Sequence, residues 1–338
     1  MRRATVLVIA GLLTAAATAS ASSSSRSQFA SSEIQAVVDA GLMGPSVQAF
    51  RPNDPLTASE LAVVVASLGG AISIDDPNAP VTVRELDARL VTLAGLRSSA
   101  QTIRLAAVGA GLTPRSWLGT ETVARMLGFR INHPREEDEL ELEVSDPVTR
   151  AEAAYSIAKY LTLSGEQVES TRTLGDTFSL PPLSAWQRVV LDRALRFVGS
   201  PYVWAGTSEK PQQLFGKVLP GGFDCSGFVW RVYKTKPFAG APELTHVLVG
   251  RTTYAMSGEV GRANRVSREA LAPGDVVFFG SNGTRSKPSQ VGHMGIYVGN
   301  GWIVHSSRNG TTLTPMTGWY ETTFAWGRSP LVEAGLEY

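Results

Sequence analysis

The sequence contains a single cysteine, Cys225, among its 338 residues. One cysteine cannot form an internal disulfide, so the folded parts of the chain must be held together by hydrophobic cores. Hydrophobic residues make up 43% of the chain, which is sufficient for such cores, and the length favours two domains. The lone thiol is therefore an inert core residue, an intermolecular cross-link or a reactive nucleophile.

The sequence also lacks a strong excess of charge of either sign. Its 31 Lys and Arg residues nearly balance 30 Asp and Glu residues, which gives a formal net charge of +1 at pH 7. It contains no basic stripe, zinc-finger spacing or phosphate-binding glycine loop. These absences exclude nucleic acid as an expected partner.

The N-terminus has the composition of a secretory signal peptide. Arg2 and Arg3 provide a basic start, residues 6–13 an apolar centre, and Ala19-Ser20-Ala21 a cleavage pattern of small residues. The apolar run is shorter than the roughly 20 residues that span a bilayer. We expect a signal peptide over 1–21, a flexible Ser-rich leader over 22–28 and no membrane span after cleavage. An uncleaved anchor is the alternative.

Residues 29–163 have mostly helical apolar spacing. Three segments share the pattern Pro-apolar-Thr-x-x-Glu, in which Thr and Glu form a capping box at a helix start. The threonines are Thr57, Thr82 and Thr149, separated unevenly by 25 and 67 residues. The pattern therefore indicates either a degenerate repeat or an ordinary helical bundle.

Residues 134–143, PREEDELELE, are acidic and predict a solvated loop. Residues 164–183 lack periodicity and predict an interdomain linker. Over 184–338 a helix is followed by short strand-like runs at 275–280, 293–299 and 302–307. This order predicts an α+β domain with an antiparallel sheet, preceded by an all-α domain.

The stretch FDCSGFVWRVY places Cys225 at the start of a predicted helix. Asp224 is a suitable N-cap, which puts Cys225 in the first helical turn. The unpaired N–H groups of a helix start favour a thiolate over a thiol, so this is a good position for a nucleophile. Such a nucleophile still needs a base.

Two of the four histidines, His293 and His305, flank a predicted hairpin with its turn at 299–301. A two-residue turn would place their side chains on opposite faces of the sheet. A three-residue loop pairs 298 with 302, and therefore 295 with 305, and places both side chains on one face. We expect the three-residue loop. His293 would then take the proton from Cys225, and His305 would orient His293.

The motifs FVGSPYVWAGTS, DCSGFV, LAPGDVVFF and GHMGIYVGNG…IVHSS resemble the NlpC family of bacterial cell-wall peptidases, over about residues 186–330. The resemblance implies a papain-like fold that cleaves peptidoglycan stem peptides, usually between D-γ-glutamyl and a diamino acid. It assigns Cys225 as nucleophile, His293 as base and His305 as orienting residue. Tyr202 matches the tyrosine beside the nucleophile, and Asp224 and Ser226 match residues that line the substrate cleft.

One segment departs from the family pattern. Residues 208–222 form a longer link than is usual between FVGSPYVWAGTS, the motif that contains Tyr202 (the tyrosine motif), and Cys225. We expect this segment to form a flap over the cleft. Trp204 is expected to be a core aromatic. Cys225, His293 and His305 lack the paired-ligand spacing of a zinc site, so no metal or cofactor is expected.

The first helical repeat, with its Phe-x-Pro turn and Thr-x-x-Glu start, resembles an S-layer homology (SLH) repeat. The third copy has the fuller TRAE at 149–152, whereas the first has Ala58 in place of the basic residue. The resemblance implies that an SLH-like domain over 29–163 holds an exported protein against cell-wall polymers.

Together these features predict a secreted, cell-wall-associated bacterial cysteine endopeptidase that acts on peptidoglycan stem peptides. Two alternatives remain open. One is an N-acetylmuramoyl amidase or other acyl-transfer enzyme with the same triad, and the other is a wall-binding scaffold without catalysis.

Overall fold

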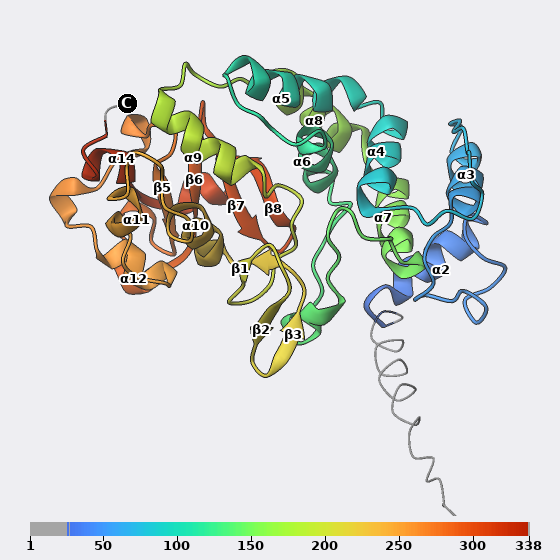
Figure 1. Cartoon of the computed structure of the whole chain (residues 1–338). Coiled ribbons are helices and arrows are strands. Elements are labelled where there is room, and N and C mark those ends of the chain that lie inside the picture. The colour runs from blue at the N-terminus through green and yellow to red at the C-terminus, as the bar shows by residue number, and fades with distance from the viewer. Residues whose placement is uncertain (1–25, 27, 337–338) are drawn as a thin grey trace, which may run out of the picture.

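The computed structural model describes residue 26 and residues 28–336. It confirms the predicted fold class, with a helical N-terminal half and a C-terminal half built on an antiparallel sheet (Figure 1). The predicted signal peptide and leader residues 22–25 and 27 lie outside the described residues. Among the described residues, none of the helices has the length and apolar character required to cross a membrane.

The N-terminal half consists of helices joined by short turns. Its α-helices are α2 (Ser31–Asp39), α3 (Ala58–Ser67), α4 (Val83–Leu93), α5 (Arg97–Gly109), α6 (Leu118–Met126), α7 (Arg150–Leu161) and α8 (Gly165–Asp176), with the 3-10 helix η1 (Arg135–Leu140) between α6 and α7.

The three repeat segments meet at one point of this half. Leu56 N–H donates to the carbonyl of Val148 (2.9 Å), Val148 N–H to that of Val81 (2.8 Å), and Val81 N–H to that of Leu56 (2.9 Å). All three side chains are buried. Capping boxes begin α3 and α4, and the Thr149 hydroxyl accepts from Glu152 N–H at the start of α7. The three copies of the degenerate repeat are therefore equivalent in the structure, because each joins the next in a closed cycle of backbone hydrogen bonds. The SLH resemblance stays a prediction.

The side chain of Glu152 does not close a capping box because it is used in a buried ion cluster. It lies 2.9 Å from His133 Nε2 and 3.2 Å from Arg26 Nη1. The other ring nitrogen of His133 lies 3.2 Å from Glu141. Arg26 is helical and largely buried, so at this residue the prediction of a flexible leader is wrong.

The segment 164–183, predicted to be a linker without regular structure, contains α8. Ser164 and Gln167 form a capping box at its start. The helix packs against α5 and α6, with Thr171 and Gly175 buried. Its weak apolar periodicity follows from this packing, because small and polar residues make much of the contact.

The C-terminal half has a five-stranded antiparallel sheet in the order β8-β7-β6-β5-β9. Helix α10 packs on one face of the sheet against β6 and β7 (Figure 1). The strands are β1 (Thr207–Ser208), β2 (Gln212–Leu214), β3 (Lys217–Leu219), β4 (Gly222–Phe223), β5 (Val276–Gly280), β6 (Val291–Gly299), β7 (Trp302–Ser307), β8 (Gly310–Pro315) and β9 (Phe324–Arg328). The helices are α9 (Ala185–Leu195), α10 (Cys225–Tyr233), α11 (Leu244–Val247), α12 (Thr253–Gly258), α13 (Trp319–Thr323) and α14 (Pro330–Glu333).

We expect Leu56→Ala to lower the free energy of unfolding by about 2–5 kcal/mol, because it opens a cavity beside the hydrogen-bonded cycle of the repeats. Val63→Ala, at a side chain that is 58% exposed in α3, is the matched control and should change stability by less than about 0.5 kcal/mol. Urea unfolding followed by circular dichroism measures both. Equal effects of the two variants would contradict a central role for this cycle.

The pKa of His133 offers a pH test of the ion cluster. Burial lowers this pKa, but hydrogen bonds to Glu141 and Glu152 outweigh burial and raise it to about 9. The stabilisation is therefore complete below the unfolded-state pKa of about 6.5 and is lost as the pH rises through 9. We expect His133→Gln to lower the Tm at pH 6 by several degrees and by much less at pH 10. His246→Gln, at an exposed histidine, should show no such dependence. A Tm difference for His133→Gln that is constant with pH would refute this assignment.

Candidate active site

Cys225 is the first residue of α10, as predicted. Asp224 is the N-cap, and its carboxylate accepts a hydrogen bond from Gly227 N–H. The thiol is only 9% exposed and lies 3.6 Å from Thr253 Oγ1. The backbones of Ser226 and Met294 also lie within hydrogen-bonding reach of it. The thiol therefore sits between the start of α10 and strand β6.

The electrostatic environment of the thiol differs from the prediction. Burial, followed by the negative charge of Asp224, raises the pKa of Cys225 to about 11, although Thr253 and the two backbone groups act in the opposite direction. The helix start was expected to favour the thiolate, but desolvation outweighs it. The resting thiol is protonated at neutral pH and needs a base.

The hairpin between β6 and β7 has a different turn from the one predicted, but it still places His293 and His305 on one face of the sheet. Gly299 pairs with Trp302 across a two-residue turn, Asn300-Gly301, in which both residues have positive φ. The predicted three-residue loop is therefore wrong. However, the register shifts between Tyr297 and Gly299, so that Tyr297 pairs with Ile303 and Ile296 with Val304. Continuing this pairing places His305 opposite residue 295, on the face that His293 occupies.

The two histidines are hydrogen-bonded to one another. His293 Nε2 lies 2.9 Å from His305 Nδ1, and their rings are perpendicular. Gly295 makes this approach feasible, because a Cβ at 295 would lie only 2.9 Å from the Cβ of His305. Burial lowers the pKa of His293 to about 4 and that of His305 well below its usual value. Both rings are therefore neutral at neutral pH, and a neutral imidazole can accept a proton.

Aromatic side chains that the sequence analysis did not single out surround this pair. The ring of Tyr320 lies 5.0 Å from that of His305 and 6.1 Å from that of His293. Phe279, directly opposite His293 on β5, and Trp319 lie within 6.0 Å of the His293 ring. These rings exclude water from the pair and account for the lowered pKa values.

The structure places Cys225 beside the strand of His293 without joining the two side chains. The thiol reaches the backbone of Met294, the residue that follows His293. In the part of the chain that the structure describes, no hydrogen bond links Cys225 to His293. Hydrogen bonds of catalytic groups are often completed only when substrate binds.

Asp224 and Ser226 lie in one network with an arginine that the sequence analysis missed. The Ser226 hydroxyl donates to Asp224 (2.9 Å), and Arg251 donates to Ser226 Oγ (2.8 Å) and to the carbonyl of Ala205 (3.0 Å). No local pattern marks Arg251, because its partners are 25 or more residues away. The network fixes the carboxylate and hydroxyl on either side of Cys225.

Tyr202 also lies near the thiol. Burial raises the pKa of its phenol, and the charges of Cys225 and Asp224 act in the same direction. Its backbone carbonyl accepts from Asn132 Nδ2 (3.0 Å) of the helical half. The structure thus brings the predicted residues Tyr202, Asp224 and Ser226 to the surroundings of Cys225.

The helical half forms part of this site. Trp204 N–H donates to Asp138 Oδ2 (2.8 Å), and Arg125 donates to the carbonyls of Gly199 (2.6 Å) and Asn309. The acidic segment 134–143 is only in part the predicted solvated loop. Residues 134–136 and 139 are exposed, but the segment contains η1, and Asp138, Leu140 and Glu141 are buried. Trp204 was expected in the core, but it is 42% exposed.

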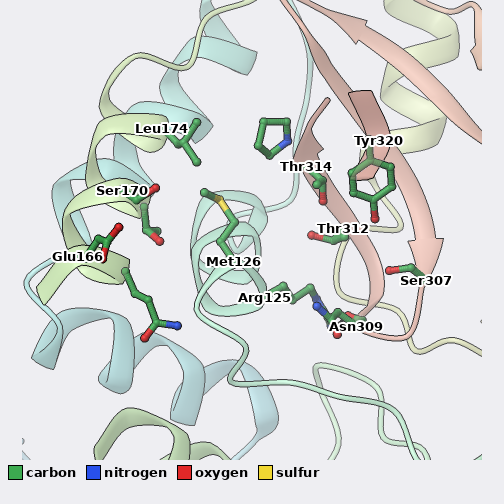
Figure 2. Close-up of a pocket in the computed structure, with 13 residues that line it drawn as sticks. Arg125, Met126, Glu166, Ser170, Leu174, Ser307, Asn309, Thr312, Thr314 and Tyr320 are labelled. Atoms are coloured by element: carbon green, nitrogen blue, oxygen red, sulfur yellow. Dashed lines mark hydrogen bonds between the residues drawn. The ribbon is translucent and has the colours of Figure 1, made fainter. Parts of the chain in front are cut away.

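A cavity of about 610 Å³ lies between α8 and strand β8 (Figure 2). Side chains of α8 point towards those of β8 across it, and Tyr320 lines it as well as contacting His305. Its walls from the two halves include Glu166, Ser170, Leu174, Thr312 and Thr314.

Residues 199–328 match the model of the NlpC/P60 family. Murein DD-endopeptidase MepH of Escherichia coli is 32% identical over 123 residues, which are 36% of this chain and 37% of that protein. Gamma-D-glutamyl-L-lysine dipeptidyl-peptidase of Bacillus cereus is 35% identical over 113 residues, 33% of this chain and 26% of that protein. The chain therefore spans well under half the length of these relatives.

A crystal structure of an NlpC/P60 family protein from Bacillus cereus is also similar. It is 26% identical and has a TM-score of 0.33, and the similarity covers 45% of this chain and 42% of that chain.

We expect Gly295→Ala to destabilise the protein by about 1–3 kcal/mol, because the added methyl group would meet His305 Cβ at 2.9 Å and the Val304 carbonyl at 3.0 Å. Gly292→Ala is the matched control on the same strand, where a Cβ would meet nothing within 4 Å. Urea unfolding measures stability, and imidazole ¹⁵N shifts report the hydrogen bond between the histidines. If Gly295→Ala leaves both unchanged, the close approach at 295 is not required.

Proposed function

Because the C-terminal half of this chain contains an NlpC/P60 domain, we propose that the protein is a peptidoglycan hydrolase that acts as a cysteine endopeptidase on stem peptides. The bond that it cleaves would be the amide between a D-γ-glutamyl residue and a diamino acid. The observation that carries the proposal is the 2.9 Å contact of His293 with His305, on the strand whose backbone reaches the chain's only thiol.

The hydrogen bond between the histidines supports the roles that we propose for them. When His293 donates through Nε2–H to His305 Nδ1, its Nδ1 is left as a proton acceptor. His305 is fully buried and holds the ring of His293 in its orientation. It acts as the orienting third member of a Cys–His–His triad.

The reaction then follows from neutral starting groups. His293 takes the thiol proton of Cys225 as the sulfur attacks the carbonyl carbon of the scissile amide. The resulting imidazolium gives this proton to the leaving amine, and the C–N bond breaks to leave a thioester. His293 next removes a proton from water, which attacks the thioester, and the proton returns to the sulfur as the acid product leaves.

The raised pKa of Cys225 and the lowered pKa of His293 set a condition on this chemistry. Proton transfer from sulfur to imidazole is uphill in the resting site, so thiolate formation must accompany substrate binding and attack. Bound substrate would bring the two side chains into contact and complete the hydrogen bond.

We further propose that the protein is exported and acts in the bacterial cell wall, with the helical half in contact with wall polymer. Arg150 of the TRAE segment would not make that contact itself. It is buried, donates to the carbonyl of Phe50 (2.7 Å) and pairs with Glu60. A polymer would have to bind elsewhere on this half.

We expect Cys225→Ala to reduce hydrolysis of purified peptidoglycan by at least about 10³-fold, because it removes the nucleophile. His246→Gln, which changes an exposed side chain that is not among the described contacts of the thiol, serves as a control and should retain activity. Mass spectrometry of released fragments identifies the bond: an endopeptidase frees the amino group of the diamino acid, whereas an amidase releases the whole stem peptide.

Equal hydrolysis by wild type and Cys225→Ala would rule out the cysteine mechanism. Binding of peptidoglycan by both proteins without hydrolysis by either would instead support a scaffold.

A further inference from the structure

The acidic segment of the helical half and the insertion before Cys225 lie side by side. The insertion, 208–222, forms the hairpin β2–β3, and η1 lies against it (Figure 1). Lys217 of the hairpin pairs with Glu139 of η1 at 3.1 Å. A cavity of about 320 Å³ lies between the two elements. The predicted flap is thus docked on the helical half.

Arg135, the first residue of η1, contacts two aromatic rings. Its guanidinium carbon lies 4.6 Å from the centroid of Trp204 and 5.4 Å from that of Phe215. Trp204 follows Tyr202 by two residues, and Phe215 is at the tip of the hairpin, 67% exposed. One side chain therefore joins the tyrosine motif, the insertion and the helical half.

The hydrogen-bond donors of Arg135 are available. Arg135 forms no hydrogen bond or ion pair with another residue in the described parts of the chain, 26 and 28–336. The neighbouring acids Asp138 and Glu139 are already engaged, the first by Trp204 N–H and the second by Lys217. An arginine that is oriented by ring stacking and keeps its planar fork of donors free suits a carboxylate.

This guanidinium lies near the tyrosine motif. Arg135 and Cys225 both act electrostatically on the phenol of Tyr202, and Arg135 contacts the ring of Trp204, two residues further along the chain. Arg251 is already bound to Ser226 and Asp224, the residues on either side of Cys225 in the sequence. Within the described residues Arg135 forms no ion pair, although its charge acts to lower the pKa of Asp138, and it lies beside the tyrosine motif.

We propose that Arg135 is a specificity-determining residue that binds a free carboxylate of the stem peptide. This inference rests on the proposed function, in which the glutamyl residue is linked through its side chain and so keeps its α-carboxylate free beside the scissile bond. The carboxylate of the diamino acid has the same chemistry. A bidentate pair with Arg135, stacked on Trp204 and Phe215, would favour either of these over an uncharged amide.

The test uses the mature protein and three synthetic stem peptides: one with both carboxylates free, one amidated at the glutamyl α-carboxyl, and one amidated at the diamino acid. For the wild type we expect the KM to be about tenfold higher for the peptide whose amide replaces the bound carboxylate. Arg135→Gln should raise the KM for the free peptide to that same level, with kcat unchanged. Arg135→Lys should restore part of the difference.

Arg97→Gln is the matched control, since Arg97 is an exposed arginine of the same half and lies over no aromatic ring among the described residues. It should leave all three KM values unchanged, and the Tm of both glutamine variants should equal that of wild type. The peptide on which wild type loses affinity identifies which carboxylate Arg135 binds.

The two proposals fail in different ways. If wild type cleaves none of the peptides, the proposed function fails. If wild type cleaves them and Arg135→Gln shows the same KM ratios as wild type, or changes kcat alone, the assignment of Arg135 is overturned.

Discussion

One irregularity of the sheet, the register shift between Tyr297 and Gly299, is the constraint on which the histidine pair depends. The two-residue turn Asn300-Gly301 alone would put His293 and His305 on opposite faces. The extra residue of the shifted strand changes the pairing by one position and returns both imidazoles to one face. Gly295 then leaves the room that their 2.9 Å contact requires.

Local chemistry explains what the sequence predicted correctly. The start of α10 at Cys225 follows from Asp224, whose short side chain caps a helix, and the starts of α3 and α4 follow from their capping boxes. The shared face of the histidines was also correct, but the turn behind it was wrong. Bulges depend on neighbouring strands, so the residues 299–301 alone could not reveal one.

The elements that the sequence analysis missed are stabilised by contacts distant in the chain. Helix α8 packs through small and polar residues on α5 and α6, and therefore shows little periodicity. Three residues of the acidic segment, Asp138, Leu140 and Glu141, are buried, and Asp138 accepts a hydrogen bond from Trp204, 66 residues away. The same contact brings the helical half to the surroundings of the thiol. The surroundings of the thiol therefore include residues of both halves, which share one hydrophobic core.

The closed cycle of Leu56, Val81 and Val148 has no end member. Loss of any one segment would leave one N–H and one C=O of the other two without partners in an apolar interior, which is costly. Such repeats cannot be gained or lost singly, as stacked repeats of a solenoid can. Through evolution the helical half is expected to be inherited, exchanged or deleted only as a whole.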